Sequence, residues 1–417
     1  MRRRITPDLL RSNREFRTFW SGQTISLFGD QISLLAIPLL AVLTLDAGAA
    51  QMGLLTAVGL APNLLFSLHA GAWADRKASR RRLMLVADLG RAGLLATIPL
   101  AYVLGALTLG QLYVVAFGIG SLSVLFFVSY NTLFVALVDR DEYVAASSLL
   151  NGSRALSLVG GQSLAGVLVA ALTAPFALLA DALSFVGSAF FLRRIRVQEP
   201  PPAPSGRGRM RAGLRFIART PVVRAALGAS ATINLFNFMF WAIFVLYATR
   251  ELGIGAVALG LLLGAGALGA VLGSLVTSRL TSRVGIGRAL VIGFLLFPAP
   301  LVLWPLASGP MPVVLGLLGL AEFGSGVGVM ILDISLGALL AAVVPDQLRA
   351  RVSGAYMLVN FGVRPLGAIL GGALGAAIGL RPTLWIATVA SLTGVLWLLP
   401  SPLPRLRQLP EAAPVEA

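Results

Sequence analysis

Five acidic residues lie within long apolar runs of the 417-residue chain, where a charge is costly. They are Asp30, Asp88, Asp181, Glu322 and Asp333. An ionised side chain at the centre of a bilayer costs roughly 2.5–3.5 kcal/mol on insertion scales, so such residues face a protein interior or a water-filled cavity. Acids in that setting bind cations or exchange protons. These five residues are therefore the first candidates for function.

Asp30 lies about ten residues into the run 20–45, roughly 15 Å deep at 1.5 Å per residue. Gln23, Ser26 and Ser33 share its helical face. Burial disfavours the charged form of a carboxyl group, so we predict that Asp30 loads and releases a coupling proton. The alternative is a structural ion pair with a basic residue such as Arg154.

Glu322 and Asp333 are eleven residues apart, which returns to nearly the same helical face about 16 Å further along. Together they could relay protons or favour cationic substrates. Alternatively, Asp333 lies near the membrane interface and is simply hydrated, so Glu322 is the stronger candidate. Asp88, its neighbour Arg91 and Asp181 are interpreted as structural, because each is expected near the end of a helix.

A second set of polar residues is expected to line a substrate cavity. Asn234, Asn237 and Trp241 alternate with phenylalanines, and aromatic walls with a few amides suit bulky amphipathic compounds. Plain packing and internal ion pairs of the arginines with Asp30 or Glu322 are the alternatives. The predicted cavity residues are Gln23, Asn131, Arg154, Asn234, Asn237, Trp241, Asn360 and Arg364.

The elements that must position these residues are membrane-spanning helices. Hydrophobic residues make up 57% of the chain and charged residues only 12%, whereas soluble domains are about a quarter charged. Runs of about 20 apolar residues can cross a bilayer. We expect an all-α integral membrane protein with twelve such helices, at roughly 20–45, 52–74, 83–105, 111–137, 144–172, 176–192, 222–248, 255–278, 289–307, 313–342, 352–379 and 383–400.

The two halves of the sequence resemble each other. TISLF at 24–28 matches TINLF at 232–236, and GGQSLAG at 160–166 matches LGAILGG at 366–372, with nearly equal offsets. We predict two pseudo-symmetric six-helix bundles, 1–195 and 220–400, joined by a cytoplasmic linker at 196–219 and followed by a tail at 401–417. A duplication of this kind places the transport pathway between the halves.

The net charge of +16 does not indicate a nucleic-acid partner, because of where the charges lie. All but five of the 33 basic residues fall in the N-terminal tail or in loops expected on one side of the membrane. This asymmetry predicts a multi-pass protein of the cell membrane with both termini in the cytoplasm. The chain has no cysteine, which excludes disulfides and thiolate metal sites.

The stretch GAWADRKASRRR at 71–82 resembles the loop signature of the major facilitator superfamily. NREFRTFWSGQTISLFGDQI, LMLVADLGRA, ADALSF and VPDQLRARVSGAY resemble its exporter branch, which holds macrolide-type drug efflux pumps and the enterobactin exporter. The resemblance implies alternating access by a monomer. Two segments depart from the family pattern: Gly161 to Gly166 lacks the usual proline, and SRLTSRVGIGR at 278–288 lacks the aspartate.

The loop signature also predicts a conformational latch, formed by Gly71, Asp75, Arg76, Arg80 and Arg81. A carboxylate at a helix end can meet arginines or the positive N-terminus of another helix, here near 352–354. The alternative is a basic loop that only sets the topology of the chain.

The function predicted from these features is proton-coupled export of an amphipathic small molecule, a drug or a siderophore. The partners are that substrate, protons and the lipid bilayer. A lipid or lysolipid flippase or a uniporter of the same fold is the alternative, and a non-transporting membrane receptor is more remote. An enzyme is not expected, since His-Glu-x-x-His and Gly-x-Ser-x-Gly are absent, and no Gly-x-x-x-x-Gly-Lys-Ser/Thr segment supports use of ATP. No cofactor or metal is predicted.

Overall fold

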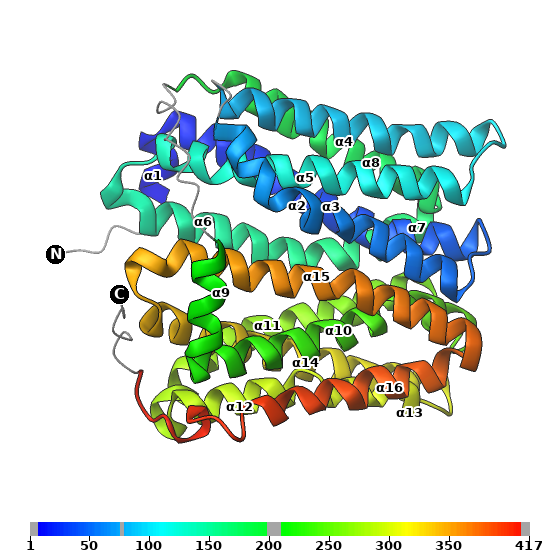
Figure 1. The fold of residues 1–417 in the computed structure, drawn as a ribbon. Helices are drawn as coiled ribbons and strands as arrows, with labels where there is room; N and C mark the ends of the chain where they lie inside the picture. The colour runs from blue at the N-terminus through cyan, green and yellow to red at the C-terminus, as the bar shows by residue number, and fades with distance from the viewer. Residues whose placement is uncertain (1–6, 76–78, 198–209, 410–417) are drawn as a thin grey trace. The chain divides into compact units, whose positions relative to one another are not determined.

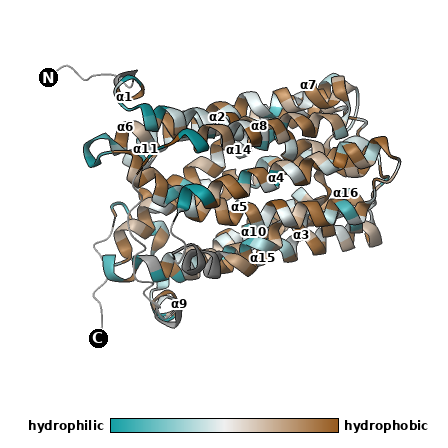
Figure 2. Cartoon of the chain, turned by 90° about the horizontal axis from the view of Figure 1, so that it is seen from above, coloured by the Kyte–Doolittle hydropathy of each residue, from teal (hydrophilic) through white to brown (hydrophobic). Residues whose placement is uncertain are grey.

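The computed structural model describes residues 7–75, 79–197 and 210–409, and these residues form helices and no strands (Figure 1). Eleven of the described helical segments are long and apolar enough to cross a membrane. Hydrophobic residues cover most of their length, and hydrophilic residues gather near the helix ends (Figure 2). The expectation of an all-α membrane protein is confirmed.

The helices of the first half match the expected apolar runs to within several residues. A π-helical turn, η2, splits the fifth run. The elements are α1 (Pro7–Ser12), α2 (Arg14–Leu43), α3 (Ala49–Asp75), α4 (Arg80–Val103), α5 (Leu109–Leu137), η1 (Arg140–Glu142), α6 (Tyr143–Leu156), η2 (Ser157–Gly161), α7 (Gln162–Leu172) and α8 (Ala174–Arg194).

The second half begins with a short amphipathic helix in the expected linker. Its elements are α9 (Met210–Arg219), α10 (Pro221–Arg250), α11 (Ala256–Val284), α12 (Ile286–Leu296), η3 (Ala299–Val302), α13 (Leu303–Leu306), α14 (Met311–Val343), α15 (Asp346–Ile378), α16 (Leu380–Leu392), η4 (Thr393–Trp397) and η5 (Leu403–Arg405).

Besides the fifth, two of the expected spans are not single α-helices. The ninth is broken between α12 and α13, where Pro298 and Pro300 lack the backbone N–H that a continuous helix needs. The twelfth consists of α16, which has 13 residues, and a 3₁₀ continuation to Trp397. This last helix is too short to count among the eleven spans, although its position agrees with the run predicted at 383–400.

The chain divides into two compact units. Unit 1 contains residues 1–47, 58–206 and 255–261, and unit 2 contains residues 48–57, 207–254 and 262–417. Each unit takes a short segment from the opposite half of the sequence. Within unit 1, Gly166 of α7 lies against Gly260 of α11, and within unit 2, Gly53 of α3 lies against Gly372 of α15. Small residues at these positions let the helix backbones approach closely.

Local sequence signals explain how α2, which carries Asp30, is held in unit 1. Asn13 caps the helix by accepting a hydrogen bond from the Phe16 backbone N–H at 2.9 Å. The Asn13 side chain also donates to the Leu137 carbonyl at 2.8 Å and so ties α2 to the end of α5. Farther along, Thr24 donates to the Ser153 hydroxyl at 3.0 Å, which links α2 to α6. These contacts fix the helix on which the central acid lies.

Candidate functional site

Asp30 belongs to a cluster of charged residues within unit 1. Its carboxyl group is half-buried and has favourable electrostatic interactions with Arg91 of α4 and Arg154 of α6. It also interacts unfavourably with the carboxyl groups of Asp88 and Asp181. The cluster therefore contains three acids and two arginines. The sequence suggested Arg154 as a partner of Asp30, but it did not suggest the other three residues.

Arg91 is the more enclosed of the two arginines in this cluster. Only 4% of the side chain is exposed, and it forms a salt bridge with Asp88, which is fully buried. Its guanidinium carbon lies 4.6 Å from the ring centre of Phe126 and 4.1 Å from that of Phe185. Cation–π contacts of this kind stabilise a guanidinium that has lost its water. Arg91 is thus a fixed positive charge beside Asp30.

Asp181 of α8 reaches the same cluster and is 1% exposed. Its Oδ1 accepts a hydrogen bond from Ser184 at 2.9 Å, and its Oδ2 accepts one from Ser33 of α2. Ser33 was expected on the face of Asp30, and it is the residue that joins α2 to Asp181. No local sequence pattern predicts that Asp181 lies near Asp30, because the two residues are about 150 positions apart.

The other predicted residues of unit 1 have varied surroundings. Gln23 is buried, and its Nε2 has no hydrogen-bond partner among the described residues. Asn131 and Arg154 are exposed, and Arg154 interacts electrostatically with Tyr130 as well as with Asp30. Tyr130 in turn packs 5.4 Å from the ring of Phe19.

The predicted latch is described only in part. Gly71 lies in α3, and Arg76 and the side chain of Asp75 lie outside the described residues. Arg80 is buried at the start of α4. Arg81 donates to the carbonyl oxygens of Arg193 and Ile195, at 3.1 and 2.7 Å, and so fastens the start of α4 to the end of α8.

A polar network in unit 2 joins α10 to α15. Arg364 Nε donates to Asn234 Oδ1 at 2.9 Å, and Asn234 Nδ2 donates to Asn360 Oδ1 at 3.0 Å. Asp333 of α14 is exposed and interacts electrostatically with Arg364. These four predicted residues, taken from three helices, are therefore brought together by the fold.

Two further cavity candidates flank this network on α10. The Oδ1 atom of Asn237 is buried and has no hydrogen-bond partner in the described part of the chain. Trp241 is half-buried, and its ring lies 6.2 Å from that of Phe240 and 4.9 Å from that of Phe244. The aromatic surroundings expected for these amides are present within unit 2.

Glu322 lies apart from the arginines. It is 6% exposed, and its Oε1 accepts a hydrogen bond of 2.9 Å from the indole N–H of Trp304. Trp304 is fully buried between Phe240 and Phe244. Although Glu322 and Asp333 share one helix, their surroundings differ: an aromatic pocket for the first and an arginine for the second. The sequence did not identify Trp304 as a partner, because it lies in the broken ninth span.

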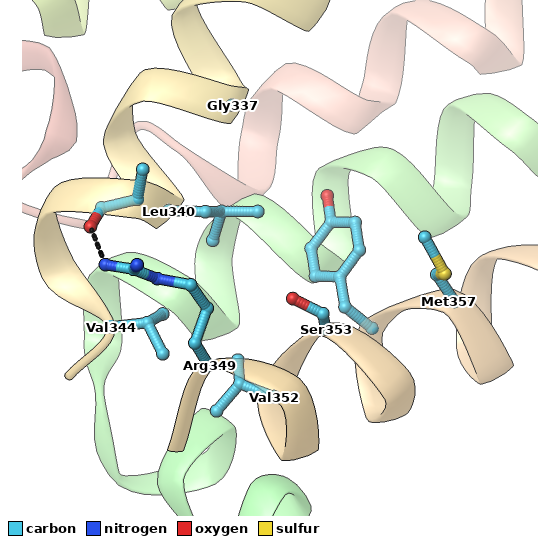
Figure 3. A pocket seen from close by; sticks show the side chains of 9 residues that line it. Gly337, Leu340, Val344, Arg349, Val352, Ser353 and Met357 are labelled. Carbon is cyan, nitrogen blue, oxygen red and sulfur yellow. Dashed lines mark hydrogen bonds between the residues drawn. The ribbon is translucent and has the colours of Figure 1, made fainter. Parts of the chain in front are cut away.

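A hollow of about 290 Å³ lies next to the network, between the end of α14 and the start of α15 (Figure 3). The side chain of Arg349 lies at one end of it and donates to the Ala341 carbonyl at 3.2 Å. Tyr356 lies along its wall and donates to the Ser230 hydroxyl at 2.5 Å. The remaining lining is mostly apolar, with Leu340, Val344, Val352 and Met357. Such a hollow accepts apolar groups beside a few polar contacts.

Known proteins resemble this chain along nearly its whole length. A family profile described as transmembrane secretion effector matches residues 10–415. The multidrug efflux pump Tap of Mycolicibacterium fortuitum is 29% identical over 407 residues, covering 91% of this chain and 93% of Tap. The MFS-type transporter YfiS of Bacillus subtilis strain 168 is 28% identical over 390 residues, covering 89% of each chain.

Solved structures share the fold at lower identity. The bacterial homologue of the iron transporter ferroportin, in an inward-facing state, has a TM-score of 0.73 at 17% identity and covers 93% of this chain and 98% of its own. The nucleoside transporter NupG has a TM-score of 0.71 at 15% identity, with the same coverage. The helical fold, the apolar spans and the match over residues 10–415 lead to one conclusion: the chain is a membrane transporter and belongs to the transmembrane secretion effector family of MFS transporters.

Proposed function

We propose that this transporter exports an amphipathic small molecule in exchange for protons, by alternating access. The observation that carries the proposal is the cluster of three acids and two arginines around Asp30 within unit 1. Fully ionised, that cluster has one negative charge too many, and an uncompensated charge in a membrane interior is strongly unfavourable. Uptake of one proton relieves it. Asp30 is the member of the three acids that is least buried, so it is the proposed point of proton exchange.

The proposed substrate class follows from the polar groups of both units. The residues proposed to bind substrate are Gln23, Asn131 and Arg154 in unit 1 and, as a separate group, Asn234, Asn237, Trp241, Asn360 and Arg364 in unit 2. Amides and guanidinium groups set among aromatic rings suit molecules with an apolar body and polar substituents. One relative is a multidrug efflux pump, which supports a drug-like substrate. A catecholate siderophore is a narrower possibility within the same class.

Glu322 and Asp333 are proposed as further proton-coupling residues in unit 2. Glu322 is the better placed of the two, because its charge would be buried without an arginine or lysine beside it among the described residues. Asp333 is exposed and has the positive charge of Arg364 beside it, whereas Glu322 has no such partner among the described residues. Separate neutral variants of the two acids would reveal whether more than one proton moves in each cycle.

The arrangement in the membrane is also a proposal. The basic residues are concentrated in the tail and in alternate loops, which supports cytoplasmic termini. Action as a monomer in the cell membrane is proposed from the family alone. The latch around Asp75 would close the cytoplasmic side in one state. Asp75→Asn is then expected to slow transport while membrane insertion stays normal, and unchanged flux in this variant would exclude the latch.

The test uses purified protein in liposomes that contain a pH-sensitive dye. Lipophilic cations, macrolides and catecholate siderophores are added in turn, and proton movement and substrate flux are both recorded. The proposal predicts that at least one compound drives proton movement in the wild type and that Asp30→Asn abolishes it. Asp141→Asn is the matched control, because this acid is exposed in the short helix η1 that precedes α6.

Two outcomes would contradict the proposal. Substrate flux without proton movement in wild type and Asp30→Asn alike would make Asp30 structural and the protein a uniporter or a flippase. Proton movement that survives in Asp30→Asn at the wild-type rate would leave exchange intact but remove Asp30 from it.

A further inference from the structure

We propose that the coupling proton is shared between Asp30 and Asp181, so that the proton-binding site is a pair of carboxyl groups on α2 and α8. This inference rests on the proposed function and identifies a second residue in its central step. From the sequence we interpreted Asp181 as structural, but the contacts of its side chain place it against the helix that carries Asp30.

The first observation is the close approach of Asp181 to α2. Gly29 precedes Asp30, and a Cβ atom at this glycine would collide with Asp181 Oδ1 and with the Ser184 hydroxyl. The absence of a side chain at Gly29 is therefore what allows the carboxyl group of Asp181 to reach the α2 backbone. Ser33, one turn beyond Asp30, donates to the other oxygen of the same carboxyl group. Asp181 therefore contacts α2 at Gly29 and at Ser33, which lie before and after Asp30 in the sequence.

The second observation is the arrangement of charges around the two acids. Arg91 of α4 interacts with both Asp30 and Asp181, and Arg154 of α6 interacts with Asp30. Asp88 of α4 already forms a salt bridge with Arg91. Tyr130 of α5 interacts with Arg154 as well. Three carboxylates against two guanidinium groups leave one charge uncompensated.

The third observation is that Arg91 is not fully used. Its Nε has no hydrogen-bond partner among the described residues, although the side chain is 96% buried between two aromatic rings. Buried donors are normally paired. An unpaired donor beside three acids points to a site whose hydrogen bonds change with protonation. When Asp30 or Asp181 is ionised, its carboxylate interacts more strongly with Arg91 than its protonated form does.

These observations fix how the pair operates. Asp88 keeps its salt bridge, so the proton belongs to Asp30 and Asp181. Two neighbouring carboxylates repel each other, and a single proton then serves the pair rather than either residue alone. Asp30 is half-buried and exchanges the proton with water, whereas Asp181 is enclosed and raises the cost of leaving both acids ionised.

The test measures protonated carboxyl groups directly, by infrared titration of the full-length protein in detergent, without any substrate. Asp181→Asn removes a negative neighbour of Asp30, so the midpoint of the titration should move to lower pH by about one unit, a tenfold change in proton concentration. Asp30→Asn should leave a carboxyl group that titrates, also at lower pH. The double variant should lose the part of the titration that belongs to this pair and keep the signals of the other acids, such as Asp88 and Glu322.

Ser33→Ala should shift the titration midpoint in the opposite direction. It also provides an independent test if Asp181→Asn does not fold. It removes a donor to the ionised form of Asp181 and leaves every charge in place, so the midpoint should move to higher pH. Ser129→Ala is the control, since this buried hydroxyl bonds only to the Leu125 carbonyl of its own helix among the described residues. Its midpoint should equal that of the wild type.

The outcomes separate this inference from the proposed function. If Asp30→Asn removes the titration while Asp181→Asn and Ser33→Ala match Ser129→Ala, the proton resides on Asp30 alone and the pair is disproved, although exchange in liposomes still holds. If the paired shifts are observed but no compound drives proton movement in liposomes, the pair stands and the export proposal fails.

Discussion

The guanidinium carbon of Arg364 lies 5.0 Å from the centre of the Phe238 ring, and Phe238 occupies the position in the second sequence copy that Asp30 holds in the first. A second ring, that of Phe361, lies 4.7 Å from the same carbon. In unit 1, by contrast, Arg154 interacts with the carboxyl group of Asp30. The two matching positions therefore place a carboxyl group beside an arginine in unit 1 and a ring beside one in unit 2, where the carboxyl partner of Arg364 is Asp333 of α14. The ring of Phe238 cannot take up a proton, so the proposed exchange at this position is limited to Asp30.

Replacing Phe238 by leucine should weaken the hold on Arg364 without changing any charge. A cation–π contact contributes about 0.5–2 kcal/mol, depending on how far the cation is desolvated. Thermal unfolding in detergent should show Phe238→Leu to be less stable by an amount in that range. Phe236→Leu on the same helix is the control, because its ring has no arginine contact in the described structure. Equal stability of the two variants would contradict a role for the ring.

Asn234 should be more important for stability than Asn237, although both are amides on α10. Asn234→Ala leaves Arg364 Nε and Asn360 Oδ1 without their partners, and an unsatisfied buried polar group costs about 1–3 kcal/mol. Asn237→Ala removes an amide oxygen that has no partner among the described residues, so it should cost little. Thermal unfolding of the two variants side by side measures the difference. A larger loss for Asn237→Ala would show that the network is misassigned.

Gly29 should not tolerate a methyl group. An alanine there would press against the carboxyl group of Asp181 and the hydroxyl of Ser184, so α2 and α8 would have to separate. We expect Gly29→Ala to lower thermal stability by about 1–3 kcal/mol and to impair proton movement. Gly187→Ala on α8 is the control, since its Cβ would meet Ile25 Cγ2 at 3.6 Å, an ordinary contact. Wild-type stability in Gly29→Ala would contradict the close contact of α2 with α8 at Gly29.

Much of the fold could be predicted from the sequence because a membrane imposes a simple rule. A spanning helix must be apolar over about 20 residues, so the apolar runs mark α2 to α8 and α10 to α15 within a few residues. The ninth span is broken at Pro298 and Pro300, whereas its apolar content alone predicts one continuous helix. The short α16 followed by a 3₁₀ turn had no comparable signal.

The candidate site was less predictable, because its contacts join helices that are distant in sequence. Asp30 was recognised from its depth and its polar face, which are properties of one helix. The contacts of Asp181 with Ser33, and of Trp304 with Glu322, depend on how helices pack. Gly29 was the one local clue, since a glycine beside a buried acid allows another helix to approach. One sequence cannot say which helix does so.

The protein should tolerate replacement of Glu322 by glutamine but not loss of the indole group that donates to Glu322. Its carboxyl group is buried against Trp304 and has no arginine or lysine beside it among the described residues, which favours the neutral form. Glu322→Gln keeps an oxygen that accepts the indole hydrogen bond, so thermal stability should change by less than about 1 kcal/mol. Trp304→Phe removes the donor and part of a buried ring, and the unpaired acceptor with the lost packing should cost about 2–4 kcal/mol.

Glu322→Gln also tests whether Glu322 takes part in proton coupling. Because Glu322→Gln is expected to fold normally, its ratio of protons moved to substrate exported can be compared directly with the wild-type ratio in liposomes. A lower ratio makes Glu322 a second proton carrier, and an unchanged ratio makes it a neutral, structural acid. Marked instability of Glu322→Gln would contradict the neutral form. An amide of the same shape replaces a neutral carboxylic acid at little cost, but it cannot replace an interaction that needs the negative charge.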